Sequence, residues 1–278
     1  MSTACTPTFA PVDAQVKATL ASRGWTVPAT MPNTEWMERG DVATLDGVLA
    51  LIDAAKARNK LPVDQHQKLL SQLLQRSPKK TGTLFEVVER HMHQMKKGRD
   101  ISHDALHGTD RIEIKGSRVI TQKNAEQATN LFECLLGEER FFAPVQQALA
   151  LSYDCNIQQV KCRSFERIFY CLYFADAIVE CEMSTEQLQS FIEDKTTGIC
   201  GHVSAGALSD KAGTTTNAEK RHVIEKMQLA YSDFQHAGNE GEGQFHIKPS
   251  NILYHLTRHC KRVYSYSEFA DVLKAQPV

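Results

Sequence analysis

A short stretch near the middle of the chain carries acidic and basic side chains at β-strand spacing. It runs from Arg111 to Val119 with the sequence RIEIKGSRV. Because side chains alternate between the two faces of a strand, Glu113 and Lys115 share one face and the flanking isoleucines lie on the other. The strand therefore places a carboxylate and an ammonium group side by side.

A second acidic residue precedes this strand at a distance that suits a hairpin. Residues 101–106 are predicted to form the partner strand, and the sequence HGTD at 107–110 is typical of a turn. Such a hairpin folds Asp104 back towards Glu113, so that two carboxylates converge with Lys115. Paired carboxylates hold Mg²⁺, and a neighbouring lysine supplies positive charge to an anionic phosphate or an attacking water.

The constellation resembles the PD-(D/E)xK nucleases, and most closely the type II restriction endonucleases among them. The residues that carry the resemblance are His103-Asp104, the segments 106–108 and 112–119, and more loosely 158–183. The resemblance does not extend to either end of the chain. It implies a restriction-endonuclease-like core and an enzyme that hydrolyses phosphodiester bonds.

In the mechanism that this resemblance implies, Asp104 and Glu113 bind Mg²⁺ and the Ile114 carbonyl is a candidate third ligand. Lys115 orients or deprotonates the attacking water, and the products carry 5′-phosphate ends. The expected partner is double-stranded DNA with a specific short, palindromic site. A homodimer is expected as the active species, because two-fold symmetry lets one active site per chain cut both strands.

Other acidic residues compete with this assignment. The family's motif has a proline before its aspartate and none precedes Asp104, so Asp100 stays an alternative ligand. Asp110 lies in or beside the turn, where its side chain is expected to cap the turn. A second E-x-K sequence at 193–195 lies among polar residues without strand alternation and is interpreted as a solvated helix end.

Three residues outside the hairpin are candidates for the same site. Similar enzymes carry an acidic residue on the helix before the hairpin, and Glu86, with Glu89 as the second candidate, has that place in a helix predicted from Thr83 to about Lys97. A capping box between Thr83 and Glu86 is the structural alternative. Glu86 also lies opposite the predicted apolar stripe, which comprises Leu84, Val87, Val88, His91 and Met95. Lys161 is either a phosphate contact or part of an exposed strand edge.

Length and composition restrict the class of protein. A net charge of −1 over 278 residues argues against a nonspecific nucleic-acid coat protein, but it permits an enzyme with positive potential along one cleft. No apolar run approaches the ~18 residues of a membrane span and no signal peptide is evident, so a cytoplasmic location is expected. The 8 cysteines include no C-x-x-C pair and are interpreted as reduced, mostly buried thiols.

The predicted fold is α/β, with a central mixed β-sheet flanked by helices, a helical N-terminal part and a loop-rich C-terminal part. The predicted divisions are a flexible tail (1–11), a helical N-terminal subdomain (12–80), a catalytic nuclease core (81–195) and a C-terminal DNA-recognition region (196–278). Helices are predicted at 12–23, 41–58, 62–76, 124–136 and 138–151, and strands at 165–174 and 177–183. The turn between these strands contains Asp176, to which a structural role is assigned.

Two further regions carry predictions about partners. Gly-rich polar segments at 204–216 and 236–244 are expected to enter the DNA grooves. The residues predicted there to contact DNA are Lys211, His236, Asn239 and Gln244. The leucine-rich helices within 41–76 are either a dimer interface or a cover for the sheet.

Two other functions stay open. One keeps the nuclease core but recognises DNA structure or damage instead of sequence. The other is a non-catalytic α/β interaction module in which Asp104, Glu113 and Lys115 are surface charges on an edge strand.

Overall fold

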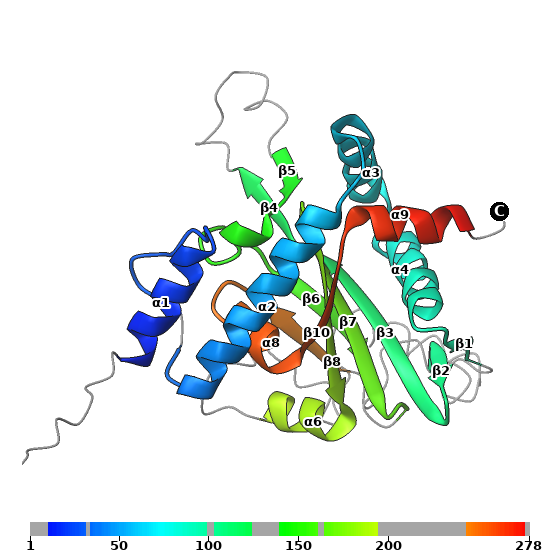
Figure 1. The fold of residues 1–278 in the computed structure, drawn as a ribbon. Coiled ribbons are helices and arrows are strands. Elements are labelled where there is room, and N and C mark those ends of the chain that lie inside the picture. Colours follow the sequence, from blue (N-terminus) through cyan, green and yellow to red (C-terminus); the bar gives the residue numbers. More distant parts are fainter. Residues whose placement is uncertain are drawn as a thin grey trace, which may run out of the picture.

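The computed structural model describes residues 11–31, 34–98, 103–123, 139–160, 164–193 and 243–275. Within these residues the central feature is a six-stranded mixed sheet (Figure 1), with the strand order β1-β2-β3-β7-β8-β10. Only β3 and β7 pair in parallel, and the other neighbours in this sheet are antiparallel. The strands are β1 (Lys96–Lys97), β2 (Ala105–His107), β3 (Asp110–Arg118), β7 (Arg167–Tyr173), β8 (Ile178–Ser184) and β10 (Cys260–Tyr264).

Helices and two small sheets surround this central sheet. The helices are α1 (Val12–Ser22), α2 (Arg39–Arg58), α3 (Val63–Gln75), α4 (Pro78–Met92), α6 (Thr185–Glu193), α8 (Ile252–His259) and α9 (Tyr266–Ala275), with a 3₁₀ turn at Val145–Gln147. The small sheets pair β4 (Ile120–Lys123) with β5 (Glu139–Phe142), and β6 (Cys155–Val160) with β9 (Gly243–Ile247). None of the described helices is long and apolar enough to cross a bilayer.

Both faces of the central strands are covered. Alternate residues of β7 point to opposite faces. Tyr170 and Leu172 belong to a core that includes α2 and α8, whereas Cys171 and Tyr173 belong to one that includes α4 and α9. The predicted α/β fold with a central mixed sheet flanked by helices is therefore confirmed at that level.

Helix α4 approaches β3 closely at a glycine. A Cβ atom built on Gly116 would lie 2.9 Å from Cγ and Cε2 of Phe85 and closer still to Cδ2. The Phe85 ring stacks on Tyr173 with a centroid distance of 3.5 Å. Glycine at this position removes the side chain that would otherwise hold the helix away from the strand.

The apolar side chains of the N-terminal helix α2 pack into the core of the same chain. The three helices predicted before residue 77 are confirmed with small shifts at their ends. Leu45, Leu49 and Ile52 of α2 are each 0% exposed in the core that includes α8. The interpretation of this stripe as a cover for the sheet is confirmed, since buried side chains are not available to another subunit.

One fold prediction is wrong, and another is corrected over the part of the chain that the structure describes. A helix at 138–151 is replaced by β5 and the 3₁₀ turn, because Phe141 and Phe142 pair with β4 and Pro144 does not suit a helix interior. The C-terminal part is not loop-rich over residues 243–275, which form β9, α8, β10 and α9. Very short connections separate these elements, so few turn residues mark their ends. The helix predicted at 124–136 lies outside the described residues.

Asp176 has the structural role that its turn position predicts. Its Oδ1 accepts a hydrogen bond of 2.9 Å from the Val145 backbone, and its Oδ2 forms a 2.9 Å ion pair with Lys56. The structure describes four cysteines, and all four are free thiols. Cys155, Cys171 and Cys181 are buried, and Cys260 is partly exposed.

Candidate active site

The predicted hairpin is present. β2 and β3 pair with Ala105 opposite Ile112 and His107 opposite Asp110. The two residues between them include Gly108, which has φ +64° and thus a backbone conformation that glycine adopts without strain. The first strand is shorter than predicted, because β2 begins at Ala105 and residues 101–102 lie outside the described part of the chain.

Asp104 is tied to β3 through both its backbone and its side chain. Its N–H donates to the Ile112 carbonyl at 3.0 Å, and its Oδ2 accepts from the Ile114 N–H at 2.8 Å. The Gly98 N–H donates a hydrogen bond of 3.1 Å to the Asp104 carbonyl, which also restrains the Asp104 backbone. The Asp104 carboxylate is thus held against the backbone of β3 at Ile114, the residue after Glu113.

The Ile114 carbonyl faces the same edge of β3 as the Asp104 carboxylate. In a strand, the N–H and C=O of one residue point to the same side. The Ile114 N–H points to Asp104, whereas the Arg111 carbonyl accepts from Glu166 beside β7. This geometry fits the expectation that the Ile114 carbonyl is a further oxygen ligand.

Glu113 and Lys115 form an ion pair on the face that they share. Glu113 is 6% exposed, so its charge is largely removed from solvent. Burial lowers the pKa of Lys115, but the negative charges of Glu113, Asp104 and Glu86 outweigh it and leave that pKa above its ordinary value. Lys115 is therefore a protonated hydrogen-bond donor among three carboxylates.

Glu86 is not a capping residue. Helix α4 begins at Pro78, and the side chain of Ser77 accepts a hydrogen bond from the Lys80 N–H at 3.4 Å. Thr83 and Glu86 therefore lie inside the helix, so the predicted start at Thr83 and the capping-box explanation are wrong. The sequence pattern misses this start because the predicted boundary at 78–82 contains a proline and a glycine, yet proline suits the first turn of a helix.

The environment of Glu86 connects it to the hairpin. Burial raises the pKa of Glu86, the Asp104 carboxylate raises it further, and Lys115 lowers it. The charges of Asp104 and Lys115 thus act on Glu86, and its place in the site stays a prediction.

The predicted apolar stripe of α4 is only partly correct. The buried residues of this helix are Thr81, Phe85, Val88 and Glu89, while His91 is exposed. Phe85 fills the space left by Gly116, and Glu89 is a buried polar residue, which an apolar pattern does not detect.

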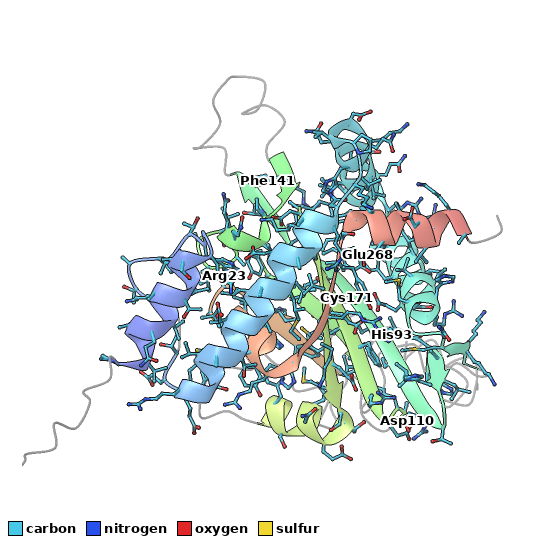
Figure 2. The ribbon with its side chains drawn as sticks, viewed as in Figure 1. Arg23, His93, Asp110, Phe141, Cys171 and Glu268 are labelled. Atoms are coloured by element: carbon cyan, nitrogen blue, oxygen red, sulfur yellow. The ribbon has the colours of Figure 1, made fainter. Side chains whose placement is uncertain are left out.

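The competing aspartate that the structure describes lies away from the site. Asp110 is at the hairpin turn (Figure 2), and its Oδ2 pairs with Arg167 at 2.9 Å. The prediction that its side chain caps the turn is wrong, because Arg167 is a stronger partner for a carboxylate than a turn N–H. The second E-x-K sequence begins at the last residue of α6, as expected of a helix end. Asp100 and Lys161 lie outside the described residues.

Of the four residues predicted to contact DNA, only Gln244 belongs to a described element. Gln244 lies in strand β9 and not in a loop, which corrects that part of the prediction. Lys211, His236 and Asn239 lie outside the described residues. A cleft lies along the end of β3 beyond Lys115, where Gly116 and Ser117 line it, whereas Asp104, Glu113 and Lys115 do not. Its charged lining residues are Arg118, Arg140, Asp154 and Lys248.

The hairpin offers oxygen ligands, as Mg²⁺ requires. The Asp104 and Glu113 carboxylates and the Ile114 carbonyl are hard donors, and Mg²⁺ is commonly held by one or two carboxylates while it keeps several waters. The donor set therefore fits Mg²⁺. These carboxylates and Glu86 do not form a tight three-residue ligand group.

The described residues do contain one tight ligand group, which the sequence analysis missed. Glu89, His93 and Glu180 have ligand atoms that all lie within 4.8 Å of one another. The available signal was the Glu-x-x-x-His spacing on a helix, which places both side chains on one face. Comparisons with protein-family models, with curated proteins and with solved structures find no match for this chain.

Proposed function

We propose that this protein is a Mg²⁺-dependent endonuclease that hydrolyses phosphodiester bonds of double-stranded DNA, similar to the type II restriction endonucleases. The observation that carries the proposal is the hydrogen bond between the Asp104 carboxylate and the Ile114 N–H. It holds Asp104 next to the Glu113–Lys115 ion pair, in a hairpin that the sequence pattern predicts.

Each residue of the site has a distinct role in this proposal. Asp104, Glu113 and the Ile114 carbonyl would hold Mg²⁺, which would supply Lewis-acid activation of the phosphate and of water. Lys115 donates a hydrogen bond to the attacking water or to a phosphate oxygen, with its charge maintained by the surrounding carboxylates. Glu86 adds a half-buried carboxyl group from α4.

The cleft beside the hairpin supports a nucleic-acid substrate. Arg140 and Lys248 line it and lie near the strand that carries Lys115. Basic side chains along one cleft bind phosphates, although the whole chain carries a net charge of −1. The substrate in this proposal is a short palindromic site, cut by a homodimer to leave 5′-phosphate ends. The buried stripe of α2 is not its interface.

A plasmid digest tests the proposal. Supercoiled plasmid is incubated with purified protein and Mg²⁺, and with Glu113→Gln and Asp110→Asn under the same conditions. Both substitutions neutralise one carboxylate of the same hairpin, so Asp110→Asn is the matched control. We expect discrete fragments with ligatable 5′-phosphate ends from the wild type and the control, and intact plasmid from Glu113→Gln. Nicking or cleavage of branched DNA alone would favour a structure-specific nuclease, and intact DNA throughout would favour a non-catalytic module.

A further inference from the structure

A second polar cluster lies on the buried side of α4, between this helix and the central sheet. Glu89 and His93 are one turn apart at the end of α4, Glu180 is on β8, and Tyr264 ends β10. Figure 2 labels His93 at this position. The His93 ring also packs on Phe169, with a centroid distance of 4.9 Å, so its orientation is fixed.

The donor atoms of this cluster converge. His93 Nε2 lies 2.5 Å from Glu180 Oε2 and 3.7 Å from Glu89 Oε2. The Tyr264 hydroxyl is 3.2 Å from the same nitrogen and donates a hydrogen bond to Glu180. Three oxygen atoms from three different elements thus surround one imidazole nitrogen.

Glu89 is 0% exposed and pairs only loosely with His93, at 3.7 Å. Neither of its carboxylate oxygens has a hydrogen bond of good geometry among the described residues, although the Cys171 thiol and Glu180 lie close enough to shift its pKa. Glu180 is also 0% exposed, and its Oε1 has none either. An isolated buried charge costs several kcal/mol, so a proton or a cation must neutralise it. The nearby Arg262 is solvent-exposed and lies over the Tyr264 ring, which places it at the rim of the cluster.

Burial and the neighbouring Glu180 raise the pKa of Glu89 well above its ordinary value. Burial alone would also raise the pKa of Glu180, but its hydrogen bond with His93 helps to leave that pKa below the ordinary value.

We propose that Glu89, His93 and Glu180 hold one divalent transition-metal ion, with the Tyr264 hydroxyl as a further donor. The mixed oxygen and imidazole set suits Zn²⁺, and a closed, buried position is typical of a structural ion, not of a catalytic one. Such an ion would fix the end of α4 to β8 and β10. This site shares no residue with the candidate active site, so it does not depend on the proposed nuclease function.

Metal loading in a variant without the hairpin site tests the proposal. Glu113→Gln protein is stripped with a chelator and titrated with Zn²⁺, and metal content and thermal midpoint are measured. We expect one Zn²⁺ per chain and a rise in the midpoint of about 5 °C or more at saturating Zn²⁺. Glu89→Gln and His93→Gln, each added to this background, should lose the bound ion and the rise. His91→Gln is the matched control, because His91 is an exposed histidine of the same helix turn, and it should keep both.

The identity of the atoms that coordinate Zn²⁺ is a second measurement, made on the Glu113→Gln protein in which Glu89 and His93 are intact. X-ray absorption of the bound Zn²⁺ should show nitrogen in its coordination shell, whereas Asp104, Glu113 and Ile114 offer oxygen alone. Failure to bind Zn²⁺ at micromolar concentration, an all-oxygen shell, or full binding by Glu89→Gln would each overturn the proposal. Absent binding together with a more stable Glu89→Gln variant would show that Glu89 and Glu180 share a proton instead. If the His93→Gln variant does not fold, the absorption measurement decides alone.

Discussion

Replacing Gly116 with alanine should loosen the packing of α4 on the strand that carries Glu113 and Lys115. The new Cβ would lie 2.9 Å from two atoms of the Phe85 ring and closer to a third. The ring has little room to move, because it stacks on Tyr173 at 3.5 Å and meets Phe269 edge-on at 6.5 Å. Overpacking of this kind typically costs about 1–3 kcal/mol, so we expect a loss of roughly 2 kcal/mol in the free energy of unfolding.

A double-mutant cycle measures this contact by urea unfolding. Phe85→Leu shortens the ring side chain and should relieve part of the clash, so that the Gly116→Ala/Phe85→Leu pair is more stable than the sum of the two single changes predicts. We expect a coupling energy of about 1–2 kcal/mol. Gly82→Ala is the matched control, because a Cβ at Gly82 in α4 meets nothing within 4 Å. It should leave stability unchanged or raise it by up to about 1 kcal/mol.

The same variant links packing to the candidate site. Glu86 follows Phe85 in α4, so an outward shift of the helix moves its carboxyl group away from Asp104, and DNA cleavage should fall with stability. A Gly116→Ala protein as stable as the wild type, with no coupling to Phe85, would refute the described contact between α4 and β3.

Three further predictions concern other parts of the chain. Arg118→Met should lower the free energy of unfolding by about 1–3 kcal/mol in urea titrations, because Nη1 of Arg118 donates to the Leu73 carbonyl at 2.7 Å at the end of α3; an unchanged midpoint would contradict this. Burial lowers the pKa of His259 from 6.5 to about 4. Between these pH values the unfolded chain binds a proton at His259 and the folded chain does not, so the free energy of unfolding decreases as the pH falls from 6.5 towards 4. His259→Gln should remove roughly 2 kcal/mol of the stability difference between about pH 7 and pH 5, and equal slopes would contradict the burial of this histidine. Asp104→Asn should abolish plasmid cleavage while Asp110→Asn, with the same charge change, stays active; activity in Asp104→Asn would move the assignment to another residue.

The β2–β3 hairpin was predictable from the sequence because its signals are local. The alternation around Glu113 defines a strand face, and the glycine at 108 suits the turn that brings Asp104 back to it. The dense apolar runs likewise predict β7 and β8, and both are buried on two faces. These elements are specified by residues within about ten positions of one another.

The features that the sequence did not reveal depend on contacts between distant residues. The start of α4 at Pro78 was interpreted as a boundary because a proline and a glycine lie close together there. Strand β10 is recognisable only from its pairing with β8, since two of its five residues are exposed and charged. The cluster of Glu89, His93 and Glu180 is buried and polar, and hydrophobic periodicity cannot find residues of that kind.

We propose that the Asp104–Glu113–Lys115 hairpin cleaves DNA with Mg²⁺. The most direct measurement is the cleavage of supercoiled plasmid by wild-type protein and by Glu113→Gln, each with Mg²⁺ and with EDTA. We expect discrete DNA fragments only from the wild-type protein with Mg²⁺. Intact plasmid under that condition, or equal cleavage by Glu113→Gln, would contradict it.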